Sequence, residues 1–112
     1  MAQESEREGS AKGEVLDASI IIEGYSGLTT IFGVIEHPPA LGYCKVLWPE
    51  KEDFYLALDL ISRLRLIGRP VGAVDVIVAS MCINRDMKLV TKDNDFEQVK
   101  KVEKSFEVDI IR

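Results

Sequence analysis

The segment 73–85 constrains the fold more than any other part of the sequence, because it is expected to be a helix and is apolar on nearly every side. Its apolar residues are Val74, Val76, Ile77, Val78, Ala79, Met81 and Ile83. A helix of this kind must be buried on several sides. The chain has 112 residues, of which 46% are hydrophobic, so it can form one domain with a small core. We therefore expect this helix to lie inside a single domain.

Short apolar strands alternate with helices along the chain. We expect strands at residues 15–16, 43–47, 88–91 and 108–111, and further helices at residues 28–36, 50–67 and 96–102. Residues 20–22 are β-branched and could form either a strand or the first turn of a helix. This alternation predicts an α/β fold in which a parallel sheet carries helices on both faces. Residues 1–13 are polar and are expected to form a disordered tail, which leaves residues 14–112 for the domain.

The helix 50–67 has well-marked ends. Glu50, Glu52 and Asp53 suit a helix N-terminus, and Gly68 suits its C-terminus. The expected buried face consists of Phe54, Ala57, Leu58, Ile61 and Leu64. A second apolar row consists of Leu56, Leu60 and Ile67. This second row could be buried inside the domain or could form a dimer interface.

Charge and cysteine content exclude some classes of protein. The net charge is −5, so the strongly basic surface typical of nucleic-acid-binding domains is absent. Cys44 and Cys82 are far apart and are expected to be buried thiols rather than ligands or a disulfide. No apolar run is long enough to span a membrane, and the N-terminus lacks the apolar stretch of a signal peptide. A cytoplasmic protein is expected.

Three aspartates are expected near the carboxyl ends of parallel strands. Asp17 and Asp93 each follow a predicted strand, and Asp75 opens the apolar helix. Taken singly, each could be a turn residue or could favour a helix N-terminus. In an open α/β sheet, however, this edge is where ligands bind. Clustered carboxylates repel one another, and a divalent cation with oxygen ligands would offset that repulsion.

A carboxylate-bound cation suits phosphodiester hydrolysis. It lowers the pKa of a bound water and stabilises charge on the phosphate, so no protein nucleophile is needed. No serine or cysteine has an obvious basic partner, and no glycine-rich phosphate loop is present. A small set of basic residues could contact RNA phosphates or could form a solvated surface. These are Arg63, Arg65, Arg69, Lys88 and Lys92, and the single histidine, His37, is expected at a helix end.

Three segments resemble the PIN-domain family. Residues 15–23 resemble its opening strand and first acid, residues 72–80 its third-acid motif, and residues 88–96 its last motif, T-x-D-x-D-F. The resemblance implies a three-layer α/β/α fold and a ribonuclease that depends on Mg²⁺ or Mn²⁺. Many small members are VapC-type toxins that a VapB-type antitoxin holds inactive. By the same resemblance, Asp17, Asp75 and Asp93 match the metal-binding acids, and Asp95 matches an extra acid found in many members.

The sequence departs from the family between Asp17 and Lys45, where only 27 residues intervene. Glu36 is the best candidate for the family's second acid, and Glu23 is the alternative. The leading hypothesis is a metal-dependent ribonuclease. Its expected substrate is RNA, and an antitoxin protein could be its partner. The other hypothesis is a weak or inactive PIN-like binding or regulatory module. We also predict a homodimer formed through the helix 50–67.

Overall fold

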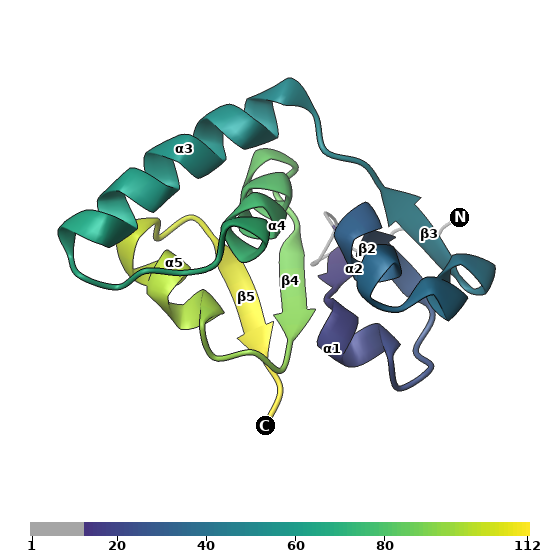
Figure 1. Ribbon diagram of the computed structural model, residues 1–112. Coiled ribbons are helices and arrows are strands. Elements are labelled where there is room, and N and C mark those ends of the chain that lie inside the picture. The colour runs from purple at the N-terminus through teal and green to yellow at the C-terminus, as the bar shows by residue number, and fades with distance from the viewer. Residues whose placement is uncertain (1–12) are drawn as a thin grey trace.

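The computed structural model describes residues 13–112 of the chain. The predicted tail lies outside the described residues, except for Gly13, whose carbonyl oxygen accepts a hydrogen bond from the Lys88 amide at 3.2 Å. In chain order the elements are β1 (Glu14–Leu16), α1 (Ala18–Ile21), β2 (Gly27–Thr30), α2 (Ile31–Glu36), the 3-10 helix η1 (Pro38–Gly42), β3 (Cys44–Leu47), α3 (Lys51–Leu66), α4 (Ala73–Asn84), β4 (Lys88–Thr91), α5 (Phe96–Val102) and β5 (Glu107–Ile110). Figure 1 shows α4 and α5 beside β4 and β5 in one half of the molecule, and α1 and α2 beside β2 and β3 in the other.

The strands form one parallel sheet in the order β3-β2-β1-β4-β5. β1 is the central strand, and Val15 lies opposite Leu28 on one side and Leu89 on the other. The chain first builds outward from β1 to β3. Helices α3 and α4 then return it to the other side of β1, where β4 and β5 follow. The strand order therefore reverses beside β1, and such a switch point is where open α/β sheets form their ligand crevice.

Helices lie on both faces of this sheet, as the sequence predicts. Consecutive residues of a strand point to opposite faces, and Val15 and Leu16 belong to different apolar clusters. Val15 packs in the main core with residues of α3, α4 and α5: Ala57, Leu60, Leu64, Val76, Ala79 and Phe96. Leu16 packs on the opposite face with residues of α1, α2 and η1: Ile21, Val34 and Ala40. The fold is thus a three-layer α/β/α arrangement.

The buried face of α3 differs from the predicted one. Ala57, Leu60 and Leu64 are buried, whereas Phe54 and Leu58 are exposed. The predicted face included Leu58, whereas the buried face includes Leu60. Both sides of the helix are apolar, and the sequence does not show which of them packs against α4. The helix begins as expected: the Glu50 amide donates to Asp53 Oδ2 at 2.6 Å, which completes a capping box.

The prediction of one helix over residues 28–36 was wrong in its first three residues. Residues Gly27–Thr30 form β2, and the helix α2 begins only at Ile31. β2 pairs on both sides, with β1 and with β3, and this pairing outweighs the helical spacing of the apolar residues. Thr30 caps the helix by accepting a hydrogen bond from the Gly33 amide at 3.2 Å. Residues 20–22, left open by the sequence, belong to the end of α1 and its C-cap.

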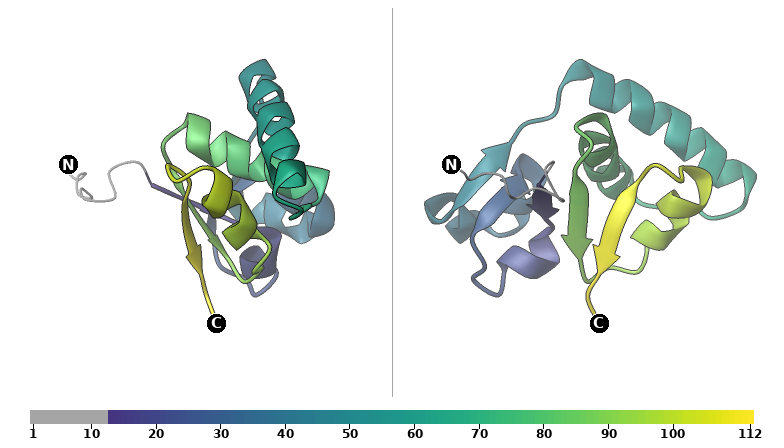
Figure 2. Two further views of the ribbon diagram at one scale, coloured as in Figure 1. Left: turned by 90° about the vertical axis from the view of Figure 1, so that its left-hand side faces the viewer. Right: turned by 180° about the vertical axis from the view of Figure 1, so that it is seen from behind.

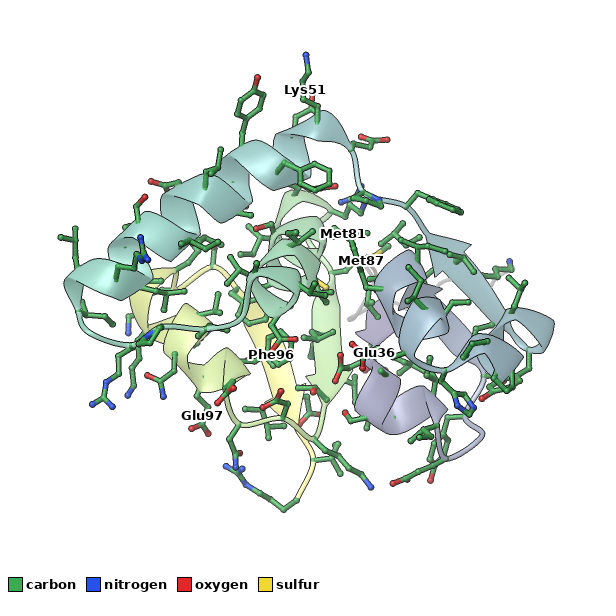
Figure 3. All side chains as sticks on the ribbon, viewed as in Figure 1. Glu36, Lys51, Met81, Met87, Phe96 and Glu97 are labelled. Atoms are coloured by element: carbon green, nitrogen blue, oxygen red, sulfur yellow. The ribbon has the colours of Figure 1, made fainter. Side chains whose placement is uncertain are left out.

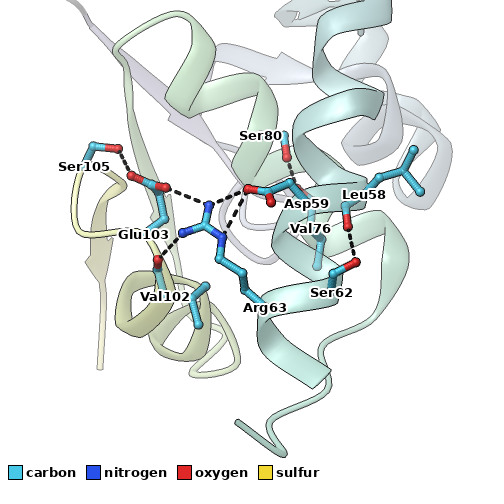
Figure 4. A network of polar contacts seen from close by, with 9 residues as sticks. All are labelled: Leu58, Asp59, Ser62, Arg63, Val76, Ser80, Val102, Glu103 and Ser105. Atoms are coloured by element: carbon cyan, nitrogen blue, oxygen red, sulfur yellow. Dashed lines mark hydrogen bonds and ion pairs between the residues drawn. The ribbon is translucent and has the colours of Figure 1, made fainter. Parts of the chain in front are cut away.

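Two arginines fasten the long helix α3 to its neighbours. Arg63 donates to the carbonyl of Val102 at 2.6 Å and to Glu103 at 2.9 Å, which ties α3 to the end of α5 (Figure 4). Arg85 forms an ion pair of 2.9 Å with Asp53, whose side chain is only 1% exposed. The second contact ties the start of α3 to the end of α4. Within residues 13–112, no helix combines the length and apolar character needed to cross a membrane.

Candidate functional site: an acidic cavity at the sheet edge

Asp17 lies where β1 ends and α1 begins. It is the N-cap of α1. Two hydroxyls fix its carboxylate: Ser19 Oγ donates to Oδ2 at 2.9 Å and Thr91 Oγ1 donates to the same oxygen at 2.8 Å. Both hydroxyls therefore donate to the same oxygen of this carboxylate.

Asp75 lies in the first turn of α4 and is half-buried. Burial raises the pKa of its carboxyl to about 6 from the usual 3.8, and the negative charges of four other acids add to the shift. These acids, in decreasing order of effect, are Asp93, Asp17, Glu36 and Asp95. Asp75 is therefore close enough to each of the other four predicted site residues to interact with it electrostatically.

Asp93 and Asp95 follow β4 in a short polar turn. The Asp93 amide donates to Thr91 Oγ1 at 3.0 Å, and the Asp95 amide donates to Asp93 Oδ1 at 2.9 Å. One carboxylate oxygen from each of Asp75, Asp93 and Asp95 lies within 4.8 Å of the others. Carboxylate oxygens at such spacing are the ligands that Mg²⁺, Mn²⁺ and Ca²⁺ prefer.

Glu36 approaches the same place from the other half of the molecule. It is the last residue of α2 and is exposed. Figure 3 shows it at the boundary between the two halves, on the side of α4 that faces α2. A cavity of about 240 Å³ has walls formed by Asp17, Glu36, Asp75 and Asp93, together with Ala18, Ser19, Ile22 and His37. The structure thus places four acids, from four separate elements or turns, around one cavity, which we call the acidic cavity.

The other candidate residues lie elsewhere. Glu23 pairs with Lys92 and does not line the acidic cavity. Arg63 is engaged with α5, and Lys88 lies 3.7 Å from Glu14 at the start of β4 and β1, away from the strand ends that carry the acids. Burial raises the pKa of Cys82 to about 12, and Cys44 is half-buried; neither thiol belongs to the acidic group.

Sequence reasoning missed the two hydroxyls that orient Asp17. Ser19 and Thr91 come from segments far apart in the chain, and the Ser19 hydroxyl also accepts from the Lys92 amide at 2.9 Å. Thr91 is fully buried. Thr91 is visible in the sequence as a threonine at the end of a predicted strand, two residues before Asp93. Its partner Asp17 could be identified only once β4 was known to pair with β1.

Solved structures share this fold. One is VapBC-5 from Mycobacterium tuberculosis, a member of the VapBC family of toxin-antitoxin systems; the match covers 90% of this chain and 98% of that chain (TM-score 0.67, 20% identity). A second is VapBC-1 from nontypeable Haemophilus influenzae, with 88% of this chain and 97% of that chain covered (TM-score 0.69, 14% identity). A third is VapBC2 from Rickettsia felis, bound to a DNA fragment from its promoter, with 88% of this chain and 98% of that chain covered (TM-score 0.62, 13% identity).

The sequence itself matches a family model over most of its length. The match is to the PIN domain and covers residues 34–102. This segment contains Glu36, Asp75, Asp93 and Asp95, while Asp17 lies before it. A search of curated proteins found no match. The family model covers more than half of the chain and agrees with the structural likeness, so this chain belongs to the PIN domain family.

Proposed function

We propose that the protein is a metal-dependent ribonuclease that hydrolyses RNA phosphodiester bonds in the acidic cavity, and that residues 14–112 are its PIN domain. The observation that carries this proposal is the convergence of Asp17, Glu36, Asp75 and Asp93 on one cavity at the switch point of a parallel sheet. Membership of the PIN domain family supports it.

The residues present fit a divalent cation. Asp75 meets four other acids, and this repulsion is part of the reason for its raised pKa; a cation bound between them would remove the penalty. Asp75, Asp93 and Asp95 would hold Mg²⁺ or Mn²⁺, with Asp17 and Glu36 completing the set. Bound there, the cation would supply an acidified water and stabilise charge on the phosphate.

The surrounding side chains prepare this site. Ser19 and Thr91 restrict rotation of the Asp17 carboxylate, because the hydroxyl of each donates a hydrogen bond to Oδ2. The Thr91 hydroxyl also accepts from the Asp93 amide, which places the turn that carries Asp93 and Asp95. Partners of this kind, one bond away from the ligands, set ligand orientation and metal affinity.

Cleavage of RNA tests the proposal. We expect the wild type to cleave single-stranded RNA with Mg²⁺ or Mn²⁺ and to be inactive with EDTA. Asp17→Asn and Asp75→Asn should each lose at least roughly a hundredfold in rate, since each removes a charge that would face the cation. Asp109→Asn is the matched control, because Asp109 is an exposed aspartate on β5 outside the cavity. Equal rates in all four proteins would rule out this site.

One observation favours the alternative, a weak or inactive binding or regulatory module. Glu36 is exposed and stands outside the group of three acids that lie within 4.8 Å of one another. Calorimetric titration with Mn²⁺ separates the two functions. Binding that disappears in Asp75→Asn, together with cleavage, supports the nuclease, whereas absence of Mn²⁺ binding supports the module.

We also propose that the protein acts as a VapC-type toxin in the cytoplasm and is inhibited by an antitoxin. The support is the shared fold with chains of VapBC toxin-antitoxin structures. Induced expression of the wild type should arrest bacterial growth, and Asp75→Asn should not. A small neighbouring gene whose product binds this chain and relieves the arrest would identify the antitoxin. Growth arrest by both proteins would show that toxicity is unrelated to the acidic cavity.

A homodimer through α3 is proposed as well. Phe54, Tyr55, Leu58 and Leu66 form an exposed apolar strip along this helix, and Leu58 is 65% exposed. Self-association would bury that strip. We expect a dimer in light scattering at micromolar concentration and a monomer for Leu58→Lys. Leu41→Lys is the matched control, since Leu41 is 67% exposed on η1. A monomeric wild type would remove this proposal.

A further inference from the structure

A second and larger cavity lies behind the acidic cavity. Its volume is about 410 Å³, within the range of sites that hold small ligands. Leu16 and Val90 form its floor; they lie opposite each other on β1 and β4 and point to the same face of the sheet. Figure 2 (right) shows β4 and β5 from behind, with no helix in front of them. The cavity therefore occupies the part of this face that α1 and α2 leave uncovered.

The two cavities have no lining residue in common, but residues that are neighbours in three segments line one cavity or the other. Leu16 lines the second cavity and Asp17 the first; Ile20 lines the second and Ser19 the first; Lys92 lines the second and Asp93 the first. Consecutive Cα atoms are only about 3.8 Å apart, so the two cavities adjoin the same three segments. An RNA strand bound at the acidic cavity would therefore have a neighbouring nucleotide within reach of the second cavity.

The chemistry of the lining fits a nucleobase. Ile20 and Val90 are apolar, and Tyr25, 60% exposed, offers an aromatic ring on which a base can stack. Ser26 supplies a hydroxyl for the edge of a base, and Glu23, which pairs with Lys92, supplies a carboxylate beside it. Lys92 and Arg112 also line the cavity, and an RNA phosphate would replace their surface ion pairs with Glu23 and Glu97.

We propose that this second cavity binds one base of the RNA, in the nucleotide next to the scissile phosphate, and that it gives the enzyme a base preference at that position. The inference rests on the proposed ribonuclease function. Tyr25 holds the base in the cavity by stacking, which suits any base, and takes no part in hydrolysis; the preference arises because the stacked base then meets the hydrogen-bonding groups of the cavity.

The first experiment measures nucleotide binding without metal or cleavage. The ¹⁵N-labelled full chain is titrated with AMP, GMP, CMP and UMP, and amide shifts are followed by NMR. At least one nucleotide should shift the amides of Tyr25, Ser26 and Ile111. Tyr25→Ala should weaken that binding by roughly tenfold, as expected for loss of one base–aromatic stack. Tyr25→Phe should retain it. Tyr55→Ala should leave it unchanged, since Tyr55 is a similarly exposed tyrosine (63%) on α3.

The second experiment sequences the ends produced from random-sequence RNA with Mn²⁺. The wild type and Tyr25→Phe should prefer one or two bases beside the cut, and Tyr25→Ala should lose that preference with a higher KM and a nearly unchanged kcat.

Nucleotide shifts at the cavity without RNA cleavage would overturn the ribonuclease and leave the base site standing. Cleavage with no nucleotide shifts at the cavity, or with the same base preference in Tyr25→Ala, would overturn the base site and leave the ribonuclease standing. Shifts at these amides that depend on protein concentration and not on nucleotide would mean that a second copy fills the cavity, which also overturns the inference.

Discussion

The Thr91 hydroxyl donates a hydrogen bond of 2.8 Å to Asp17 Oδ2 across the boundary between β4 and β1. Thr91 Oγ1 in turn accepts a hydrogen bond of 3.0 Å from the Asp93 amide. One buried threonine therefore sets the positions of two acids that are far apart in the sequence. Asp17 and Asp93 are held as a pair because the sheet places their strands side by side.

Thr91→Val should weaken metal binding more than it weakens the fold. Valine keeps the shape of the side chain but loses both hydrogen bonds, so the Asp17 carboxylate is held by the Ser19 hydroxyl alone. We expect Mn²⁺ affinity to fall by roughly 10- to 100-fold, as for other residues that orient metal ligands. The free energy of unfolding should fall by about 1–3 kcal/mol, the cost of an unpaired buried polar group. Thr91→Ser should retain the affinity in calorimetric titration; an unchanged affinity in Thr91→Val would show that Asp17 needs no such support.

Asp75→Asn should stabilise the metal-free protein at neutral pH. The folded-state pKa of Asp75 is about 6, above the usual 3.8, so the folded state binds more protons than the unfolded state between these values. Its contribution to stability is therefore lost as pH rises from about 4 to about 6. At pH 7 the asparagine variant should be more stable by about 1–2 kcal/mol, allowing for solvent screening of a half-buried group.

Urea unfolding with EDTA at pH 4 and pH 7 checks the sign of this effect. The two proteins should differ at pH 7 and agree at pH 4. Saturating Mn²⁺ should reverse the order at pH 7, because only the wild type gains binding energy. If the wild type were more stable than Asp75→Asn at pH 7 without metal, the charged Asp75 would not destabilise the folded protein, and the prediction would be wrong.

Arg85→Met should be strongly destabilising. It leaves Asp53, with a side chain 1% exposed, without its ion-pair partner at 2.9 Å. Breaking a buried pair in this way costs about 3–5 kcal/mol. Arg65→Met is the matched control, since Arg65 is exposed near the end of α3, and it should change stability by less than about 0.5 kcal/mol.

The same pair has a pH signature. Burial opposes ionisation of Asp53, but hydrogen bonds from Arg85, the Glu50 amide and Asn84 outweigh it and lower the pKa below 3.8. The stability that Asp53 contributes is thus present above about pH 4 and is lost as pH falls through the lowered pKa. Chemical unfolding of wild type and Arg85→Met should converge as pH falls below the lowered pKa of Asp53. A constant difference at all pH values would mean that packing of the arginine, and not its charge, stabilises the α3–α4 contact.

Gly33→Ala should destabilise the protein although it lies in a helix. A Cβ at this position would come within 2.5 Å of Thr29 Oγ1, which donates a hydrogen bond of 2.6 Å to the Leu16 carbonyl and cannot easily move. Overpacking of this kind costs about 1–3 kcal/mol. Gly42→Ala, where nothing lies within 4 Å of the new Cβ, is the control. In a double-mutant cycle with Thr29→Ala, most of the cost should disappear; an additive result would locate the strain elsewhere.

The second half of the chain was predicted well because its signals are local. Residues 88–91 and 96–102 were predicted with the bounds that the structure has, and the ends of α3 followed from Glu50 and Gly68. The apolar character of 73–85 also fixed α4 as the buried helix. In each case a cap, a glycine or an apolar pattern within one segment carries the information.

The errors arose where tertiary contacts decide. Residues 28–30 have helical spacing, yet they pair with two strands that are distant in the chain. On α3, two neighbouring apolar strips compete, and only the position of α4 selects Leu60 over Leu58. In the candidate site, the aspartates were visible in the motifs. Ser19 and Thr91 were not, because their partnership with Asp17 exists only once β1 and β4 are adjacent.

The strand order also determines which pieces of this gene can be expressed alone. The family match begins at Val34, after β1 and β2. A fragment cut there would keep β3 and β4, which never touch in the sheet because β2 and β1 lie between them. Helices α3 and α4 would then lack the central strands of the sheet on which they pack, and the fragment should be insoluble or unfolded. Deletion boundaries for this protein must therefore be drawn around the sheet, outside Glu14 and Ile110, and not around the segment in which sequence similarity is highest.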